Sequence, residues 1–178
     1  MTHVRVVGIV PRGSDAARLA YWPAKLSGYA SRRRCPMRVF NASITVDTEE
    51  GTEVADITKP VRDVIQDLPV TTGIALVNTL HTTCALFVNE YQAALVDDFK
   101  RMVERLVPER GGYRHDDPRY SDCERGNGHS HLRAALLGRS IAVPINDGEL
   151  TLGRFQSIIF AELDGPRSRQ ISIQVIGE

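Results

Sequence analysis

The sequence has few of the residues that mark several common classes of protein. It holds only three cysteines, Cys35, Cys84 and Cys123, and no two of them form a CxxC pair. This odd number argues against a disulfide framework and favours the reducing cytoplasm. No apolar run approaches the roughly 18 residues that a membrane span requires, and the N-terminus lacks the uninterrupted apolar core of a secretory signal. We therefore expect a cytoplasmic protein with no membrane partner.

Net charge is also absent, because 22 basic and 22 acidic residues give a formal charge of zero. This balance argues against a dedicated nucleic-acid partner. The charge is uneven, since residues 1–36 carry +6 and the remainder carries −6. Residues 1–36 are also punctuated by proline and glycine and show no clear amphipathic period. We expect them to be a basic extension, disordered, loosely packed or placed before a natural start at Met37, with residues 37–178 forming one domain.

The domain shows patterns of both strands and helices. Residues 38–47 alternate apolar and polar side chains, which predicts a strand. Thr58 is predicted as the N-cap of a helix that has Pro60 in its first turn. Two more helices are predicted over 90–106 and 128–137, and further strands over 73–80, 84–88, 140–145, 149–152, 155–163 and 170–176. Because no regular βαβ alternation is present, the predicted fold class is α+β.

Two details of the helices bear on the site. Leu95, Phe99, Met102 and Leu106 recur at helical spacing, which predicts that they lie on one stripe of the 90–106 helix. The helix over 128–137 has Asn127 as its predicted N-cap and Gly138 behind it. The polar residues 107–126 join the two helices, and a loop of this length in a compact domain is usually functional or mobile.

His81 opens the string HTTCALFVNE between two apolar runs. At a strand end its imidazole can serve as a metal ligand or base, and the hydroxyls of Thr82 and Thr83 can donate to an anionic oxygen. A histidine at the edge of the core, bonded to backbone, is an equally good interpretation. Cys84 follows within the alternating pattern and is expected to pack as a small hydrophobic residue.

The string GNGHSHLRAALLG holds His129 and His131 at the start of a predicted helix. Residues two apart on a regular helix point about 200° away from each other, so both imidazoles cannot face one metal there. An irregular first turn would allow a shared metal, and otherwise one histidine faces the site alone. The exposed N–H groups of the helix N-terminus also favour an anion such as phosphate.

Two further candidates lie outside these strings. His115, in YRHDDPRY, is either a site residue or a solvated loop histidine. Arg167 and Arg169, in DGPRSRQ, can grip a phosphate bidentately, or they are solvated charges before the final strand.

Five stretches resemble, in order and spacing, the YjbQ-like family of small proteins, often labelled secondary thiamine-phosphate synthase. They are HTTCALFVNE at 81–90, LVPERGGYRH at 106–115, GNGHSHLRAALLG at 126–138, SIAVPINDGELTLGRFQ at 140–156 and ELDGPRSRQISIQVIGE at 162–178. The resemblance covers residues 37–178. It implies an α+β two-sheet sandwich with about three helices, assembled as a homotrimer around a threefold axis.

The resemblance also implies a polar pocket built by the HTT and HSH segments, with His81 and His131 as the best-matched positions. Members of the family often carry an acidic residue where this chain has His129. Aspartate and histidine can both bind zinc, so His129 remains a candidate ligand.

These observations give two functional hypotheses, beside the alternative that the histidines are structural and no ligand binds. The first is a homotrimeric metal-binding enzyme for a small phosphorylated or anionic substrate, with thiamine-phosphate synthase activity as the named candidate. Its catalytic residues would be His81 and His131, which would also hold the metal together with His129 or His115. Its substrate-binding residues would be Thr82, Thr83, Asn127 and Arg167. The second hypothesis is a non-catalytic trimer that binds a metal or a metabolite.

The expected cofactor is a divalent metal. A histidine cluster favours zinc or another transition metal. Thiamine-phosphate synthesis releases diphosphate, and magnesium would serve that reaction, but magnesium prefers oxygen ligands. The visible ligands and the candidate reaction therefore predict different metals.

Overall fold

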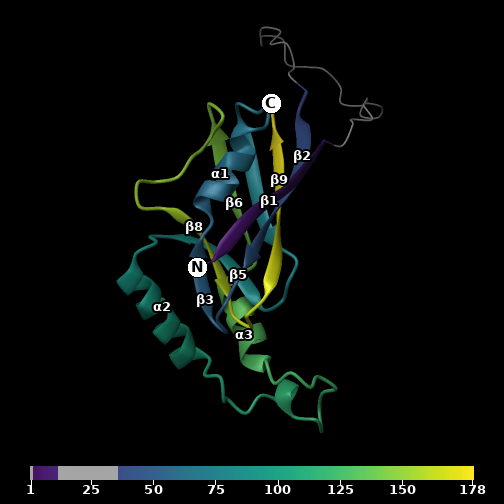
Figure 1. Cartoon of the computed structure of the whole chain (residues 1–178), viewed down its shortest axis with the longest axis vertical. Helices are drawn as coiled ribbons and strands as arrows, with labels where there is room; N and C mark the ends of the chain where they lie inside the picture. Colours follow the sequence, from purple (N-terminus) through teal and green to yellow (C-terminus); the bar gives the residue numbers. More distant parts are fainter. Residues whose placement is uncertain (1, 12–35) are drawn as a thin grey trace, which may run out of the picture.

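The computed structural model describes residues 2–11 and 36–178. Two antiparallel sheets pack face to face, and a pair of helices covers the outer face of the smaller sheet (Figure 1). This arrangement confirms the predicted α+β sandwich with three α-helices. None of the helices in the described part of the chain combines the length and apolar character that a membrane span would need.

The larger sheet has six strands in the order β1-β2-β9-β4-β6-β7. Its strands are β1 (His3–Pro11), β2 (Arg38–Asp47), β9 (Ser168–Gly177), β4 (Gly73–Thr79), β6 (Ser140–Asn146) and β7 (Glu149–Leu150). The centre of this sheet is the long β2–β9 pair, in register from Arg38 opposite Gly177 to Asp47 opposite Ser168. Alternate residues of both strands are buried, because only one face of this sheet meets the core.

The smaller sheet has the order β3-β8-β5, formed by Glu53–Asp56, Ser157–Glu162 and Cys84–Asn89. Almost every residue of β8 is buried, since this sheet is covered on both faces. Ile158 and Phe160 face the larger sheet and α1 (Thr58–Gln66) in the main core, whereas Ile159 and Ala161 belong to a second cluster beneath α2 and α3.

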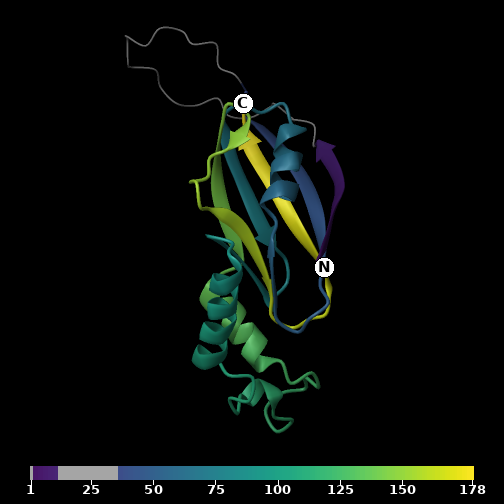
Figure 2. The same cartoon turned by 60° about the vertical axis from the view of Figure 1, so that its left-hand side comes forward.

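The helices α2 (Ala93–Leu106) and α3 (Gly128–Leu137) lie next to each other, with the loop that holds the short 3-10 helix η1 (Arg114–Asp116) beyond them (Figure 2). Val96 and Phe99 of α2 and Ala134 and Leu137 of α3 join the second cluster. Met102 and Leu106, which belong to the predicted stripe of α2, are exposed on this chain.

Other differences from the prediction occur at element ends and in short strands. β1 pairs with β2, so His3–Pro11 is part of the sheet rather than of an unstructured extension. Residues 12–35 of that extension lie outside the described residues, and the boundary at residue 37 stays a prediction. β3 was not predicted, because its four residues are too few to show a period.

The predicted helix caps also differ in detail. Ile57, not Thr58, precedes α1, and the Thr58 hydroxyl instead accepts the N–H of Ile158 at 2.8 Å. Asn127 does precede α3, but its side chain makes no capping bond. The carboxylate of Asp116 accepts the first helical N–H, that of Gly128, at 2.8 Å in its place.

Candidate functional site

The HTT segment forms the turn between β4 and β5, and it runs alongside α3 in the opposite direction. At one end of the turn, the N–H of Thr79 bonds to the carbonyl of Arg139, just after α3, at 3.0 Å. At the other end, the carbonyl of Thr83 accepts the N–H of Leu163 at 3.1 Å, and the carbonyl of Leu163 accepts the hydroxyl of Ser130 in the first turn of α3. The turn and the helix are thus tied together at both ends, with His81 between the ties.

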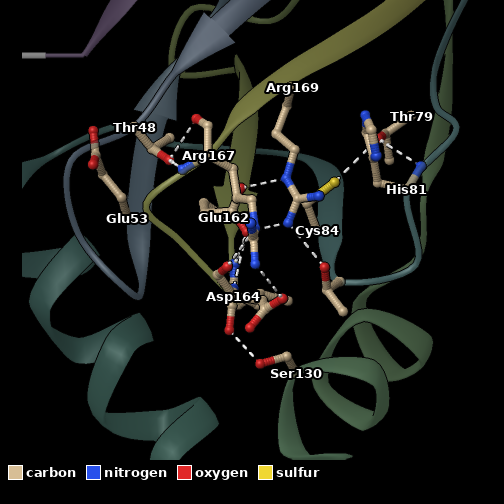
Figure 3. Close-up of polar contacts among 12 residues, drawn as sticks. Thr48, Glu53, Thr79, His81, Cys84, Ser130, Glu162, Asp164, Arg167 and Arg169 are labelled. Carbon is tan, nitrogen blue, oxygen red and sulfur yellow. Dashed lines mark hydrogen bonds and ion pairs between the residues drawn. The ribbon is translucent and has the colours of Figure 1, made fainter. Parts of the chain in front are cut away.

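A hydrogen bond from its backbone N–H holds His81 in place within the turn. Its N–H donates to the Thr79 hydroxyl at 3.3 Å, and that hydroxyl lies 3.0 Å from the Cys84 thiol (Figure 3). Cys84 and Thr79 are fully buried. This rigid base positions the imidazole, which is itself only partly buried.

On the facing helix, His131 is held next to the long loop. Its ring lies 4.8 Å from the ring of His115, centroid to centroid, at an angle of 43°. Asp116 connects the loop to the helix, because its Oδ1 accepts the Gly128 N–H and lies 3.3 Å from Nδ1 of His115. His115 therefore contacts one of the site histidines without reaching the pocket described next.

His81 and His131 line one pocket of about 390 Å³ between the turn and α3. Its remaining walls are formed by Thr82, Cys84, Ala134, Ala135, Gly138 and Arg139. Arg139 has no carboxylate partner among residues 2–11 and 36–178. The pocket therefore combines two imidazoles, a hydroxyl and one unpaired cation with a wall of small side chains.

Both pocket histidines have a pKa below the ordinary value of 6.5. For His81 the main cause is burial, and the nearby Arg169 guanidinium adds to it against the opposing effect of Glu162. Burial is also the main cause of the lowered pKa of His131, followed by His115, with Asp164 and Asp116 acting in the opposite direction. Both imidazoles are consequently neutral at pH 7, able to accept a proton or to ligate a metal.

The pKa of the pocket thiol is shifted in the opposite direction. Burial raises the pKa of Cys84 above its ordinary 9.0, although the Thr79 hydroxyl and the Arg169 guanidinium lower it in part. The thiol is therefore protonated at neutral pH and contributes volume rather than a nucleophile. Its burial confirms that Cys84 packs as a small hydrophobic residue.

Thr83 and Arg169 form a buried support behind the pocket. The guanidinium of Arg169 donates to both carboxylate oxygens of Glu162, at 2.6 and 2.7 Å, and to the Thr83 hydroxyl at 2.9 Å (Figure 3). The predicted anion donor Thr83 is thus engaged inside the protein, whereas Thr82 is exposed in the pocket.

Asn127 and Arg167 are gathered around Asp164 instead of the pocket. The Asp164 carboxylate accepts the Asn127 side-chain amide at 3.0 Å and lies 3.3 Å from Arg125 and 3.6 Å from Arg167. Arg167 also donates from Nε to the carbonyl of Asp164 at 3.2 Å. These two predicted substrate-binding residues therefore hold the loop after β8 against the start of α3.

His129 does not share the pocket with His131. α3 is regular from Gly128 onward, so residues two apart face different directions, as the helical geometry predicts. Nδ1 of His129 is buried without a hydrogen-bond partner among the described residues. On α2, the pKa of Glu104 is lowered chiefly by the N–H of Glu109 and by Arg133, with His129 as the smallest cause. Within the described ranges, no three His, Cys, Asp or Glu side chains are grouped closely enough to hold a metal ion.

Sequence reasoning identified the two pocket histidines but missed Arg139 and the small wall residues. A signal for the wall was present, since Ala134, Ala135 and Gly138 follow His131 at positions i+3, i+4 and i+7, which share one helix face. Arg139 gave no such signal, because it lies beyond the end of the helix, where its carbonyl accepts the N–H of Thr79.

Comparison with known proteins gives a consistent match. The family model described as UPF0047 protein YjbQ-like matches residues 42–178. A UPF0047 protein of Methanothermobacter thermautotrophicus is 39% identical over 142 residues, which are 80% of this chain and 95% of that protein.

Solved structures agree with these sequence matches. A YbjQ-like protein of unknown function from Sulfolobus solfataricus has a TM-score of 0.75 at 31% identity, over 80% of this chain and all of that one. A hypothetical protein from Aeropyrum pernix has a TM-score of 0.71 at 33% identity, over 78% of this chain and 98% of that one.

Proposed function

The chain belongs to the UPF0047 protein YjbQ-like family, and we propose that it acts on a small anionic substrate in the pocket of His81 and His131. The observation that carries the proposal is that two neutral imidazoles from separate elements share one pocket with Arg139, whose guanidinium has no carboxylate partner among the described residues. A general base must be neutral at the working pH and within reach of the substrate, and both histidines meet the first condition.

Each pocket group has a role in this proposal. The guanidinium of Arg139 binds the anionic group, since arginine keeps its charge at every physiological pH and can bind phosphate or carboxylate bidentately. The Thr82 hydroxyl donates to the substrate or accepts from it. One imidazole removes a proton from the bound substrate, and the other stabilises the charge that develops or returns the proton.

Thiamine-phosphate synthesis is the named candidate reaction, and the number of positive charges in the pocket bears on it. A leaving diphosphate carries several negative charges, and its neutralisation needs several cations. Within the described part of the chain, Arg139 is the only arginine or lysine that lines the pocket, and Arg167 and Arg169 are paired with Asp164 and Glu162. A substrate with a single phosphate or carboxylate suits this pocket better than a diphosphate.

The decisive experiment compares wild type with Arg139→Gln and His131→Gln. Calorimetry with inorganic phosphate measures binding, and a turnover assay with the two thiamine precursors and with small phosphate esters measures catalysis. We expect Arg139→Gln to weaken phosphate binding roughly tenfold, the loss of one charge-assisted bond pair. We expect His131→Gln to retain binding and lose turnover. Phosphate binding that is equal in wild type and Arg139→Gln would exclude the proposal.

Binding without any turnover would instead favour the second candidate, a non-catalytic metabolite-binding protein. In that case, Arg139→Gln should still lose binding.

A divalent metal, zinc first, is proposed as a further component, but one chain does not complete its site. Catalytic zinc takes three protein ligands and one open position, whereas the pocket offers two imidazoles and a protonated thiol. Magnesium suits the pocket less, because it prefers oxygen ligands and the described lining residues supply only one side-chain oxygen, the Thr82 hydroxyl. A zinc site would need a third ligand from a second copy of the chain.

Metal content of protein prepared without a histidine tag tests this proposal. Mass spectrometry of wild type, His81→Ala and His131→Ala should show near-stoichiometric zinc in the wild type and none in the variants. His129→Ala is the matched control, since this histidine does not line the pocket. Zinc that is absent from wild type after zinc has been supplied would exclude a metal role.

The homotrimer is also a proposal, and the exposed apolar side chains of the helices support it. Met102 and Leu106 of α2 and Leu132 and Leu136 of α3 are 44 to 60% exposed in the single chain. Large apolar side chains gathered on helices next to a site favour an interface with another copy. Light scattering after gel filtration should give three times the chain mass for wild type and a smaller mass for Leu132→Glu.

A further inference from the structure

The wall that α3 presents to the pocket is built from one helix face. His131, Ala134, Ala135 and Gly138 lie at positions i, i+3, i+4 and i+7, and all four line the pocket. After the imidazole, this face carries two methyl groups and a glycine. Gly138 has a φ of 91°, and a Cβ placed there would have no neighbour within 4 Å. The helix thus offers a smooth apolar strip rather than hydrogen-bonding groups.

The ends of this strip carry the polar groups. Seven residues of α-helix rise about 10 Å, so His131 and Gly138 mark two separate ends of the pocket wall. Arg139 follows Gly138 and is tied by its carbonyl to Thr79, at the start of the HTT turn. His131, at the other end, lies beside His115 and near Asp164, which acts on its pKa. The cation and the helix imidazole are therefore separated by the apolar strip.

Strand β5 adds a further apolar residue to the lining of the pocket. This residue is Cys84, whose thiol is protonated at neutral pH. A free inorganic anion held at Arg139 would leave the strip facing water. An extended polyphosphate would place charged oxygens against the strip, where no second cation among the described lining residues could pair with them, which costs free energy.

We infer that the pocket takes an anion carried on a compact apolar group of about one ring, with the anionic group at Arg139 and the apolar group against Ala134, Ala135 and Gly138. This inference rests on the proposed function, since it names the class of substrate that the same pocket selects. Ala135 is then a specificity-determining residue, because it is the exposed member of the alanine pair and its methyl group sets the depth of the strip.

Two probes with the same kind of anion test the inference. Inorganic phosphate has no apolar group, and phenyl phosphate adds a single ring. Calorimetry on the full chain should give phenyl phosphate the tighter binding by roughly tenfold or more, because part of the ring leaves water against the strip. Both titrations use the same buffer and pH, so that the two probes differ only in the ring attached to the phosphate.

Ala135→Leu fills the strip while leaving Arg139 in place, and leucine is nearly as good a helix former as alanine. Ala94→Leu is the matched control, since Ala94 is also an exposed helical alanine but lies on α2, away from the pocket. We expect Ala135→Leu to bind inorganic phosphate as wild type does and to lose the preference for phenyl phosphate. Ala94→Leu should keep both affinities. Circular dichroism and melting temperature verify that both variants are folded.

The possible outcomes distinguish this inference from the proposed function on which it rests. If wild type binds both probes equally, or if Ala135→Leu keeps the full preference for the ring, the apolar strip is not a subsite, although anion binding stands. If wild type binds neither probe, the proposed anion site fails and the inference fails with it. A preference for the ring that is lost in Ala135→Leu alone supports the inference.

Discussion

Glu162 and Arg169 form a bidentate ion pair inside the protein, with nitrogen–oxygen distances of 2.6 and 2.7 Å. Both side chains are almost completely buried, and the pair lies beside the HTT turn, where Arg169 donates to the Thr83 hydroxyl (Figure 3). Glu162 also accepts the N–H groups of Leu163 and Asp164 at 3.1 and 2.9 Å. The pair therefore connects β8, β9 and the turn that carries His81.

Glu162→Gln should be strongly destabilising. The substitution leaves the Arg169 guanidinium buried without an anion, and breaking a buried pair in this way costs about 3–5 kcal/mol. Urea unfolding of wild type and variant measures the difference in the free energy of unfolding.

The exposed pair of Lys59 and Asp63 on α1 is the matched control for this prediction. Its atoms also approach to 2.6 Å, but the lysine side chain is 81% exposed. Lys59→Ala should cost less than about 1 kcal/mol, because solvent screens the pair. Equal losses in the two variants would show that burial does not determine the cost.

The alternation of apolar residues was sufficient to predict most of the sandwich. β2 matches the predicted 38–47, and α3 matches 128–137, since each has a period long enough to recognise. β3 carries only four residues, and its place depends on pairing with β8, which lies about a hundred positions later in the chain. The exposed Met102 shows a second limit, because periodicity identifies an apolar stripe but not the surface that it meets.

The site was predicted only in part for a related reason. His81 and His131 were recognisable as chemical groups within short motifs, and the structure brings them to one pocket. Arg167 was an equally reasonable candidate by sequence, but Asp164, three residues before it, engages it. Pairing of this kind depends on the conformation of the loop after β8, which no pattern in the sequence specifies.

The reactivity of Cys84 should be low for a pocket residue. Its thiol is buried, and burial raises its pKa, so little thiolate is available to a reagent at neutral pH. Cys123 is partly exposed and serves as the internal comparison. Peptide mass spectrometry after brief treatment of native protein with iodoacetamide should find Cys123 alkylated well before Cys84. In urea the two rates should become similar, and native rates that are already equal would contradict the burial of Cys84.

Gly73→Ala should disturb the larger sheet at the β4–β9 pair. Gly73 lies opposite Gly177, and a Cβ on Gly73 would come within 2.4 Å of the Ile176 carbonyl oxygen. Because that atom belongs to the backbone of β9, it cannot move aside easily, and overpacking of this kind costs about 1–3 kcal/mol. Gly51→Ala is the control, since its nearest neighbour would be 4.0 Å away. Urea unfolding should show a clear loss for the first variant and a change within about 0.5 kcal/mol for the second.

Lowering the pH through 6.5 should reduce stability because of the pocket histidines. The pKa of His131 in the folded protein lies below its ordinary value of 6.5. As the pH falls through 6.5, the unfolded chain therefore takes up the proton first, and the free energy of unfolding decreases until the pH reaches the lower folded-state pKa. Carboxylates such as Glu53, whose pKa is also lowered, act in a separate and more acidic range.

His131→Gln should make the loss of stability below neutral pH less steep, and urea unfolding across this pH range in the presence of EDTA measures it. NMR titration of the imidazole signals supplies the independent test. The His131 signal should titrate below 6.5 in wild type and move upward in His115→Gln, because the neighbouring imidazole helps to lower its pKa. A His131 pKa at or above 6.5 would contradict the lowering that burial and the neighbouring His115 are expected to cause.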